Sequence, residues 1–127
     1  MATENIPKQV DFSAVIEAWE QTATFVKVAK TIDIPVGKMM HVKVDGKEIL
    51  IANVEGKFYA VGDRCPHMSA MLSKGTLNNS IVTCPRHFSS FDVITGKAIS
   101  GQTQDLPVYE VKVDGNDLFI ESWAGFW

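Results

Sequence analysis

Residues 64–87 read RCPHMSAMLSKGTLNNSIVTCPRH, and they contain both cysteines and two of the three histidines of this 127-residue chain. The stretch opens with Cys65-Pro66-His67 and closes with Cys84-Pro85-Arg86-His87, with sixteen residues between these two motifs. Each motif brings one thiol close to one imidazole, and the proline after each cysteine stiffens its loop. Two thiolates and two imidazoles can surround one metal centre. The stretch therefore predicts a metal site built from two short loops.

Three interpretations of these four residues compete. A structural zinc site fits the ligand types, although zinc motifs usually pair cysteine with cysteine and histidine with histidine. Four unrelated core residues would be an improbable coincidence in two matched loops. The third interpretation is a [2Fe–2S] cluster in which two histidines replace two cysteines on one iron. We favour the third.

The composition is that of one globular domain. Hydrophobic residues make up 46% and charged residues 21% of the chain, both close to the globular average. This excludes a disordered chain, a collagen and a disulfide-rich scaffold. The net charge is −3, and no basic run stands out, which argues against nucleic acid as the main partner.

We expect a cytoplasmic protein without a membrane span. No stretch reaches the 18 or so uncharged apolar residues that a membrane-spanning helix needs. The N-terminus has Glu4 and Pro7 where a signal peptide would have a basic start and an apolar run. Two cysteines in a reducing compartment indicate metal or redox chemistry more often than a disulfide.

Short runs rich in Val, Ile, Phe and Tyr flank the cysteine segment and predict strands. They cover residues 25–28, 38–44, 48–54 and 57–61, and a second β region covers residues 106–121. Asp45-Gly46 and Asp114-Gly115-Asn116 predict hairpin turns, since a type I′ turn needs positive φ at both central residues. His41 is predicted to be a solvent-facing strand residue. The sequence predicts an all-β fold, an antiparallel sandwich or small barrel, with a loop-rich insertion at residues 62–101.

Both ends of the chain differ from this β body. Residues 1–22 are predicted to form a loose arm followed by a short amphipathic helix, because four apolar residues recur at helical spacing: Phe12, Val15, Ile16 and Trp19. This helix could pack on its own domain or contact a partner subunit. The tail, residues 123–127, has three aromatic residues and could fold back on the β body or mediate self-association.

From about residue 25 to residue 121 the chain resembles Rieske ferredoxins and Rieske domains. Besides the two motifs, the family pattern is matched by Leu72, Gly75, Phe91-Asp92, Thr95-Gly96 and Leu106-Pro107-Val108-Tyr109, the last of which opens the closing hairpin. The resemblance implies one [2Fe–2S] cluster, with Cys65 and Cys84 on one iron and His67 and His87 on the other. It also implies an antiparallel β sandwich at residues 23–122, with a cluster-binding subdomain at about residues 62–101.

Four residues beside the ligands are expected to influence the cluster. High-potential members of the family have a serine and a tyrosine that donate hydrogen bonds here, whereas this chain has Ser89 and Phe91 at those positions. Ser69 and Phe88 stand where the family commonly has glycine. Two thiolates leave the oxidised cluster about neutral, which favours a potential of roughly −150 to +300 mV. With one donor lost, we expect the lower or middle part of that range.

The resemblance implies a carrier of single electrons and not an enzyme. The chain has no G-x-G-x-x-G motif and no length for a second cofactor domain. We expect it to pass electrons from a reductase to an oxygenase-type acceptor, as a component of a dioxygenase system. The alternative is a small Rieske subunit or regulatory module of a larger redox enzyme, for example a nitrite reductase or a respiratory complex. Basic residues near the motifs, Arg64, Lys74 and Arg86, would suit an acidic partner surface.

Overall fold

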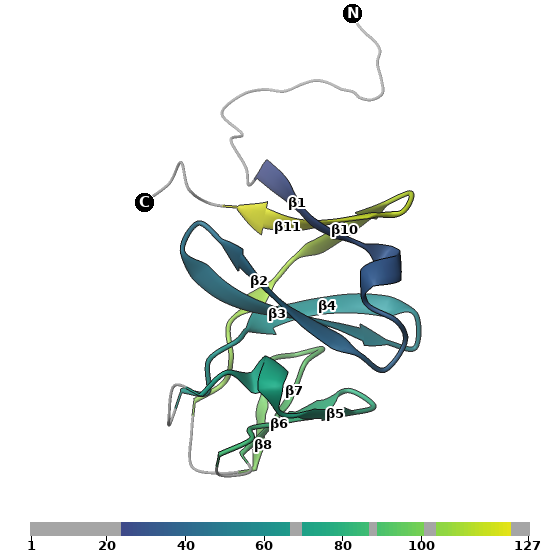
Figure 1. Ribbon diagram of the computed structural model, residues 1–127. Coiled ribbons are helices and arrows are strands. Elements are labelled where there is room, and N and C mark those ends of the chain that lie inside the picture. The colour runs from purple at the N-terminus through teal and green to yellow at the C-terminus, as the bar shows by residue number, and fades with distance from the viewer. Residues whose placement is uncertain (1–23, 67–69, 87–88, 101–103, 123–127) are drawn as a thin grey trace, which may run out of the picture.

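The computed structural model describes residues 24–66, 70–86, 89–100 and 104–122, and these residues form an all-β fold (Figure 1). The strands are β1 (Thr24–Lys30), β2 (Met39–Val44), β3 (Lys47–Val54), β4 (Lys57–Gly62), β5 (Thr76–Asn78), β6 (Ile81–Thr83), β7 (Ser90–Asp92), β8 (Ala98–Ser100), β9 (Val108–Tyr109), β10 (Val111–Asp114) and β11 (Asp117–Ser122). The described ranges also contain the 3-10 helices η2 (Thr31–Asp33) and η3 (Leu72–Lys74). The predicted N-terminal helix and the aromatic tail lie outside the described residues.

The strands form three antiparallel sheets, which confirms the predicted all-β class. Their orders are β1-β11-β10, β2-β3-β4-β9 and β5-β6-β7-β8. Figure 1 shows the first sheet at the top, the second in the middle and the third at the bottom of the molecule. Among the described residues, no helix is long and apolar enough to cross a membrane.

The middle sheet is covered on both faces, and β3 shows this most clearly because five of its consecutive residues are buried. Ile49 and Ile51 pack with Leu118 of β11 in the core below the first sheet. Leu50 and Ala52, which point to the opposite face, pack in a second core with residues of the cysteine segment. A strand buried on both faces reads as a continuous apolar run. The middle sheet therefore joins the sandwich to the cysteine segment.

Both predicted hairpin turns are present. β2 and β3 are joined through Asp45 and Gly46, whose φ angles are 53° and 80°, as a type I′ turn requires. β10 and β11 are joined through Gly115, whose φ is 62°, between the paired residues Asp114 and Asp117. These turns set the register of the strands they join.

Two features differ from the sequence prediction. Residues 106–109 were expected to open the closing hairpin, but β9 pairs with β4 in the middle sheet, and the hairpin consists of β10 and β11. The segment 62–101 is loop-rich as expected, but it also contains the four strands β5 to β8, which the sequence did not predict. Each of these strands has three residues. Runs this short do not show the alternation that identifies a strand in a sequence.

Asn53, at the end of β3, ties two turns to the middle sheet. Its buried side chain donates from Nδ2 to the carbonyl oxygen of Ile34 at 2.8 Å, and its Oδ1 accepts from the N–H of Gly56 at 2.8 Å. The side chain thus forms hydrogen bonds with one backbone group that precedes β3 in the chain and one that follows it.

Replacing Asn53 by alanine should lower the free energy of unfolding by about 1–3 kcal/mol, because the carbonyl of Ile34 and the N–H of Gly56 lose their partner. Chemical denaturation followed by circular dichroism measures this change. The matched control is Asn116→Ala, at an exposed residue, which should change stability by less than about 0.5 kcal/mol. Equal losses in the two variants would contradict the assigned role of Asn53.

Candidate metal centre

The first cysteine loop is closed at its base by a short backbone ladder. The N–H of Cys65 donates to the carbonyl of Ala70 at 2.8 Å. Arg64 and Met71 form an antiparallel bridge next to this bond. The chain enters this ladder directly from β4, so the middle sheet fixes where Cys65 begins its loop.

The second cysteine loop is closed in the same way. The N–H of Cys84 donates to the carbonyl of Ser89 at 2.8 Å. Cys84 directly follows β6, and Ser89 directly precedes β7, whose residue Ser90 pairs with Thr83. In both loops the cysteine N–H therefore binds the carbonyl five residues later. The two loops are thus closed by the same kind of backbone hydrogen bond.

Both cysteine side chains are buried in one core. Cys65 and Cys84 are 0% exposed and belong to the same apolar cluster as Leu72, Val82 and Phe91. Neither of them forms a disulfide. Two buried thiols at the start of two matched loops are the sulfur donors that an iron–sulfur centre needs, so the described part of the site fits such a group.

Some of the predicted site residues lie outside the described part of the chain: His67, His87, Ser69 and Phe88. Within the described ranges, no group of three or more His, Cys, Asp or Glu side chains could hold a metal ion. The described donors of the candidate centre are Cys65 and Cys84.

Gly75 brings the two loops together. A Cβ atom at this position would lie 1.9 Å from the carbonyl oxygen of Thr83 and 3.2 Å from Cδ of Pro85. Only glycine permits such a close approach of two backbones. The chain that returns from the first loop therefore packs directly against the residues on either side of Cys84.

Ser89 and Phe91, the predicted tuning residues, are both buried beside the second loop. Ser89 accepts the hydrogen bond from Cys84 through its backbone carbonyl. Phe91 lies in β7 and is 0% exposed, within the core that contains both cysteines. Both residues are therefore buried close to Cys84 in the structure.

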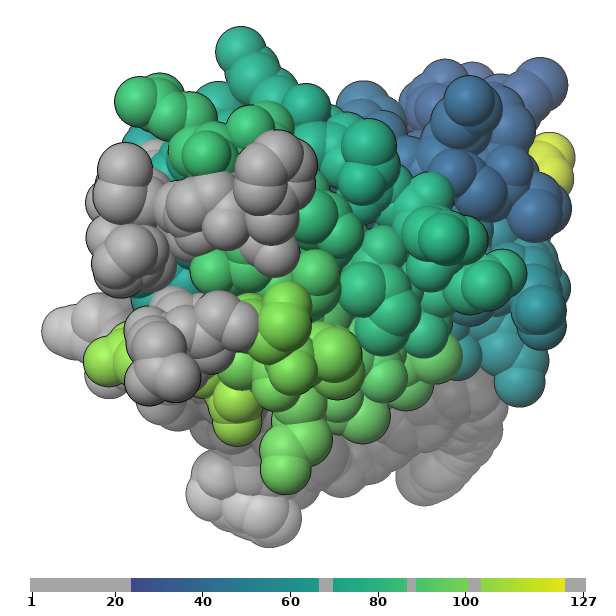
Figure 2. Space-filling view, turned by 90° about the horizontal axis from the view of Figure 1, so that it is seen from below, coloured from purple at the N-terminus to yellow at the C-terminus, as the bar shows by residue number. Residues whose placement is uncertain are grey.

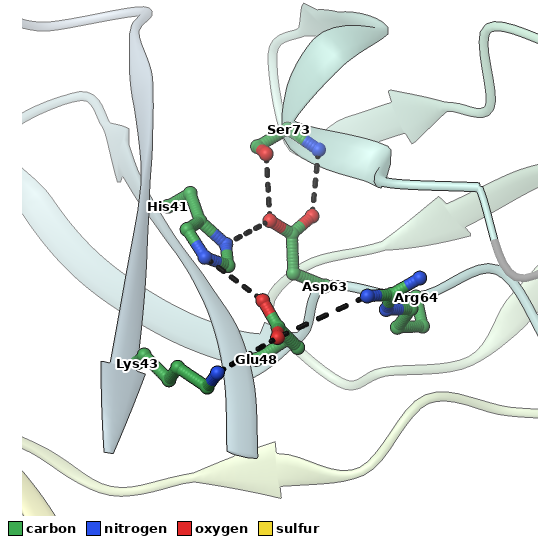
Figure 3. A network of polar contacts seen from close by, with 6 residues as sticks. All are labelled: His41, Lys43, Glu48, Asp63, Arg64 and Ser73. Atoms are coloured by element: carbon green, nitrogen blue, oxygen red, sulfur yellow. Dashed lines mark hydrogen bonds and ion pairs between the residues drawn. The ribbon is translucent and has the colours of Figure 1, made fainter. Parts of the chain in front are cut away.

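His41 does not have the solvent-facing role that the sequence predicted. Its side chain is 31% exposed and lies between two carboxylates (Figure 3). Nδ1 is 2.7 Å from Oδ2 of Asp63, and Nε2 is 2.9 Å from Oε1 of Glu48. The prediction was wrong because these contacts depend on how β2, β3 and the end of β4 come together, which the local sequence does not reveal.

Asp63 is the site residue that sequence reasoning missed. It directly follows β4, and its side chain is 0% exposed. The carboxylate accepts from the N–H of Ser73 at 2.7 Å and from the Ser73 hydroxyl at 2.6 Å, in addition to its contact with His41. The one sequence signal that could have identified Asp63 was its position two residues before Cys65.

Tyr109 lies beside this network. It lines a hollow of about 250 Å³ together with Glu48, Asp63 and Arg64. Burial, and secondly the charge of Glu121, raises the pKa of Tyr109 above its ordinary value. The phenol therefore remains neutral near pH 7 and adds no charge to the network.

Residues 24–112 match the family of the Rieske [2Fe-2S] domain, a range that contains both cysteine motifs. The chain belongs to this family. A ferredoxin component of the naphthalene 1,2-dioxygenase/salicylate 5-hydroxylase systems of Ralstonia sp is 42% identical over 101 residues, which are 79% of this chain and 97% of that protein. The 3-phenylpropionate/cinnamic acid dioxygenase ferredoxin subunit of Shigella boydii is 41% identical over 91 residues, 70% of this chain and 85% of that one.

Solved structures show the same fold. One chain in a complex of reduced oxygenase and oxidised ferredoxin in carbazole 1,9a-dioxygenase has a TM-score of 0.73 and 32% identity, over 76% of this chain and 92% of that chain. This Rieske protein therefore carries a Rieske-type [2Fe–2S] cluster. It is an electron carrier and not itself an enzyme.

Gly75→Ala should reduce the iron content of the purified protein, because the added Cβ collides with the carbonyl of Thr83 and forces the two loops apart. Iron per chain, measured by metal analysis, tests this. Gly46→Ala is the matched control: its φ of 80° makes alanine strained, but nothing lies within 4 Å. It should lose about 1 kcal/mol of stability and keep its iron. A Gly75→Ala protein with the wild-type iron content would contradict the role of this contact.

Proposed function

We propose that Cys65 and Cys84 bind one iron of the cluster, that His67 and His87 bind the other, and that the protein carries single electrons from a reductase to an oxygenase-type acceptor. The observation that carries this proposal is the family match over both motifs, combined with two buried thiols at the start of matched loops. When bound, the cluster accepts one electron and gives it up again. The proposed roles of His67 and His87 as ligands rest on the sequence motifs in which these residues occur.

The chain's own contribution is to hold the ligands in one geometry. The N–H groups of Cys65 and Cys84 are both tied to carbonyls at 2.8 Å. Gly75 holds the base of one loop against the other. Ligands that are locked by their surroundings need little rearrangement when charge changes at the site. This suits a protein whose task is to gain and lose an electron repeatedly.

The relatives favour an oxygenase as the acceptor. Those from Ralstonia sp and Shigella boydii are ferredoxin parts of dioxygenase systems. The carbazole 1,9a-dioxygenase structure contains a ferredoxin together with its oxygenase. These similarities support a ferredoxin of an oxygenase system over the alternative of a small subunit in another redox enzyme. The proposal of a reductase as the electron donor rests on the resemblance to Rieske ferredoxins alone.

The end of the molecule that contains the cysteine loops is proposed as the docking face. Figure 2 views this end, with residues of β5 to β8 in green across much of the face. Lys74 and Arg86 are exposed here, and Arg64 is exposed at the base of the first loop. Positive charge around the route of the electron would favour rapid encounter with an acidic partner.

We further propose that the cysteine segment, residues 62–101, acts as the cluster-binding part of a Rieske unit at residues 23–122. Residues 1–22 and 123–127 would then either pack on this unit or serve contacts outside it, including self-association. We also place the protein in the cytoplasm, a reducing compartment in which a pair of cysteines serves metal or redox chemistry more often than a disulfide.

Two substitutions beside the second loop should move the reduction potential in opposite directions. Ser89→Ala should lower it and Phe91→Tyr should raise it, because a hydroxyl that donates to a cluster sulfur stabilises the extra electron. One hydrogen bond of about 1.4 kcal/mol corresponds to roughly 60 mV for one electron. Protein-film voltammetry measures both shifts. Potentials that stay at the wild-type value in both variants would show that neither position reaches a sulfur.

Electron delivery tests the function itself. The reduced protein, mixed without oxygen with the oxygenase component of a naphthalene dioxygenase system, should be reoxidised rapidly, and the rate should fall as ionic strength rises. Stopped-flow absorbance records this rate. Lys74→Glu with Arg86→Glu should slow it, whereas Lys57→Glu, on the exposed end of β4, should leave it unchanged. Reoxidation no faster than with an unrelated diiron protein would contradict the proposal.

A further inference from the structure

We propose that Asp63 and His41 are positioning residues: together they lock the Cys65 loop onto the middle sheet, and this lock helps to set the reduction potential of the cluster. The proposal rests on the proposed function in one respect, namely that Cys65 is a ligand. Neither Asp63 nor His41 belongs to the ligand motifs, and Figure 3 shows the network that they form.

Asp63 closes the base of the first loop. Its carbonyl accepts from the N–H of Leu72 at 3.2 Å, and its carboxylate accepts from the N–H and the hydroxyl of Ser73 at 2.7 and 2.6 Å. Leu72 and Ser73 belong to η3, which follows the loop. Three hydrogen bonds from one residue therefore join the chain entering the loop to the chain leaving it.

Asp63 is also fastened to the middle sheet from two sides. Its N–H donates to the carbonyl of Glu48 in β3 at 3.0 Å. Its Oδ2 lies 2.7 Å from Nδ1 of His41 in β2, and the other ring nitrogen of His41 lies 2.9 Å from Oε1 of Glu48. Asp63, which directly follows β4, is therefore bonded to β2, β3 and η3. A change at this point is transmitted to Cys65, two residues along the chain.

Each ring nitrogen of the His41 imidazole contacts one carboxylate, Nδ1 that of Asp63 and Nε2 that of Glu48. A carboxylate oxygen only accepts hydrogen bonds when ionised, so both contacts of His41 are hydrogen bonds when the ring carries both protons. Lys43 and Arg64 each lie 3.8 Å from the second oxygen of Glu48. Both side chains are more than half exposed, and their printed contacts are with Glu48 and not with Asp63.

A buried carboxylate contributes little net free energy to the stability of a fold, because removing its charge from water is unfavourable. Its desolvation is offset only when its oxygens are well bonded, and apolar replacements at such sites are often neutral or stabilising. Asp63 is 0% exposed and is bonded by both Ser73 and His41. We infer that Asp63 serves to orient the Cys65 loop and not to stabilise the fold. If the base of the loop loosens, Cys65 is held less rigidly, any hydrogen bonds that its sulfur accepts become longer, and the potential falls.

Four variants separate this role from simple effects of charge and stability. His41→Phe fills the space without bonding to Asp63, whereas His41→Gln can still donate one hydrogen bond. Asp63→Asn keeps the shape but removes the negative charge. Lys43→Ala removes a positive charge that is 63% exposed and does not contact Asp63. Each is purified with its cluster, and iron content, melting temperature, reduction potential and the EPR spectrum of the reduced form are measured.

We expect all four variants to retain iron. His41→Phe and Asp63→Asn should have lower potentials than the wild type and altered EPR spectra, His41→Gln should recover part of the shift, and Lys43→Ala should match the wild type. The sign for Asp63→Asn is decisive, because loss of a nearby negative charge acting through space would raise the potential. If Asp63→Asn does not fold, His41→Phe decides alone.

Two results would overturn the proposal. The first is a lower melting temperature in His41→Phe with an unchanged potential and EPR spectrum, which would make the network merely structural. The second is a raised potential in Asp63→Asn. Both presuppose a Rieske-type EPR signal in the wild type. Its absence there would instead overturn the assignment of Cys65 as a cluster ligand, so the two failures are distinguishable.

Discussion

The contact between Gly75 and the carbonyl of Thr83 is the constraint on which the candidate centre depends. It brings two segments together so closely that no side chain fits between them. The Cys65 and Cys84 loops, each closed by its own N–H···O bond, are thereby held side by side as one unit. The cluster ligands proposed here come from two separate loops, so their relative position is a matter of backbone packing before any metal binds. This is the arrangement expected of a preformed site.

The two faces of the middle sheet have different roles in the fold. One face, with Ile49 and Ile51, belongs to the sandwich, and the other, with Leu50 and Ala52, is part of the core that contains both cysteines. A rigid β body thus supports the cysteine loops through apolar packing on one side and through the Asp63 network at the base of the first loop. An electron carrier needs such support because its cluster must accept charge without large movement of its ligands.

Sequence patterns predicted those features that depend on neighbouring residues. The Asp45-Gly46 turn, the long strands and the matched cysteine motifs all have local signals, and Gly75 stood out through the family pattern. The pairing of β9 with β4, the three-residue strands and the contacts of His41 depend on residues far apart in the chain. His41 and Asp63, for example, are 22 positions apart. A strand histidine with a polar neighbour has the same local pattern whether it faces solvent or a buried carboxylate.

The proposed cluster is tested most directly by the iron and acid-labile sulfide content of the purified wild-type protein, measured with the EPR spectrum of its reduced form. We expect two irons and two sulfides per chain and a Rieske-type spectrum, in which two histidines ligate one iron. Zinc in place of iron, or the spectrum of a cluster bound by cysteines alone, would contradict it.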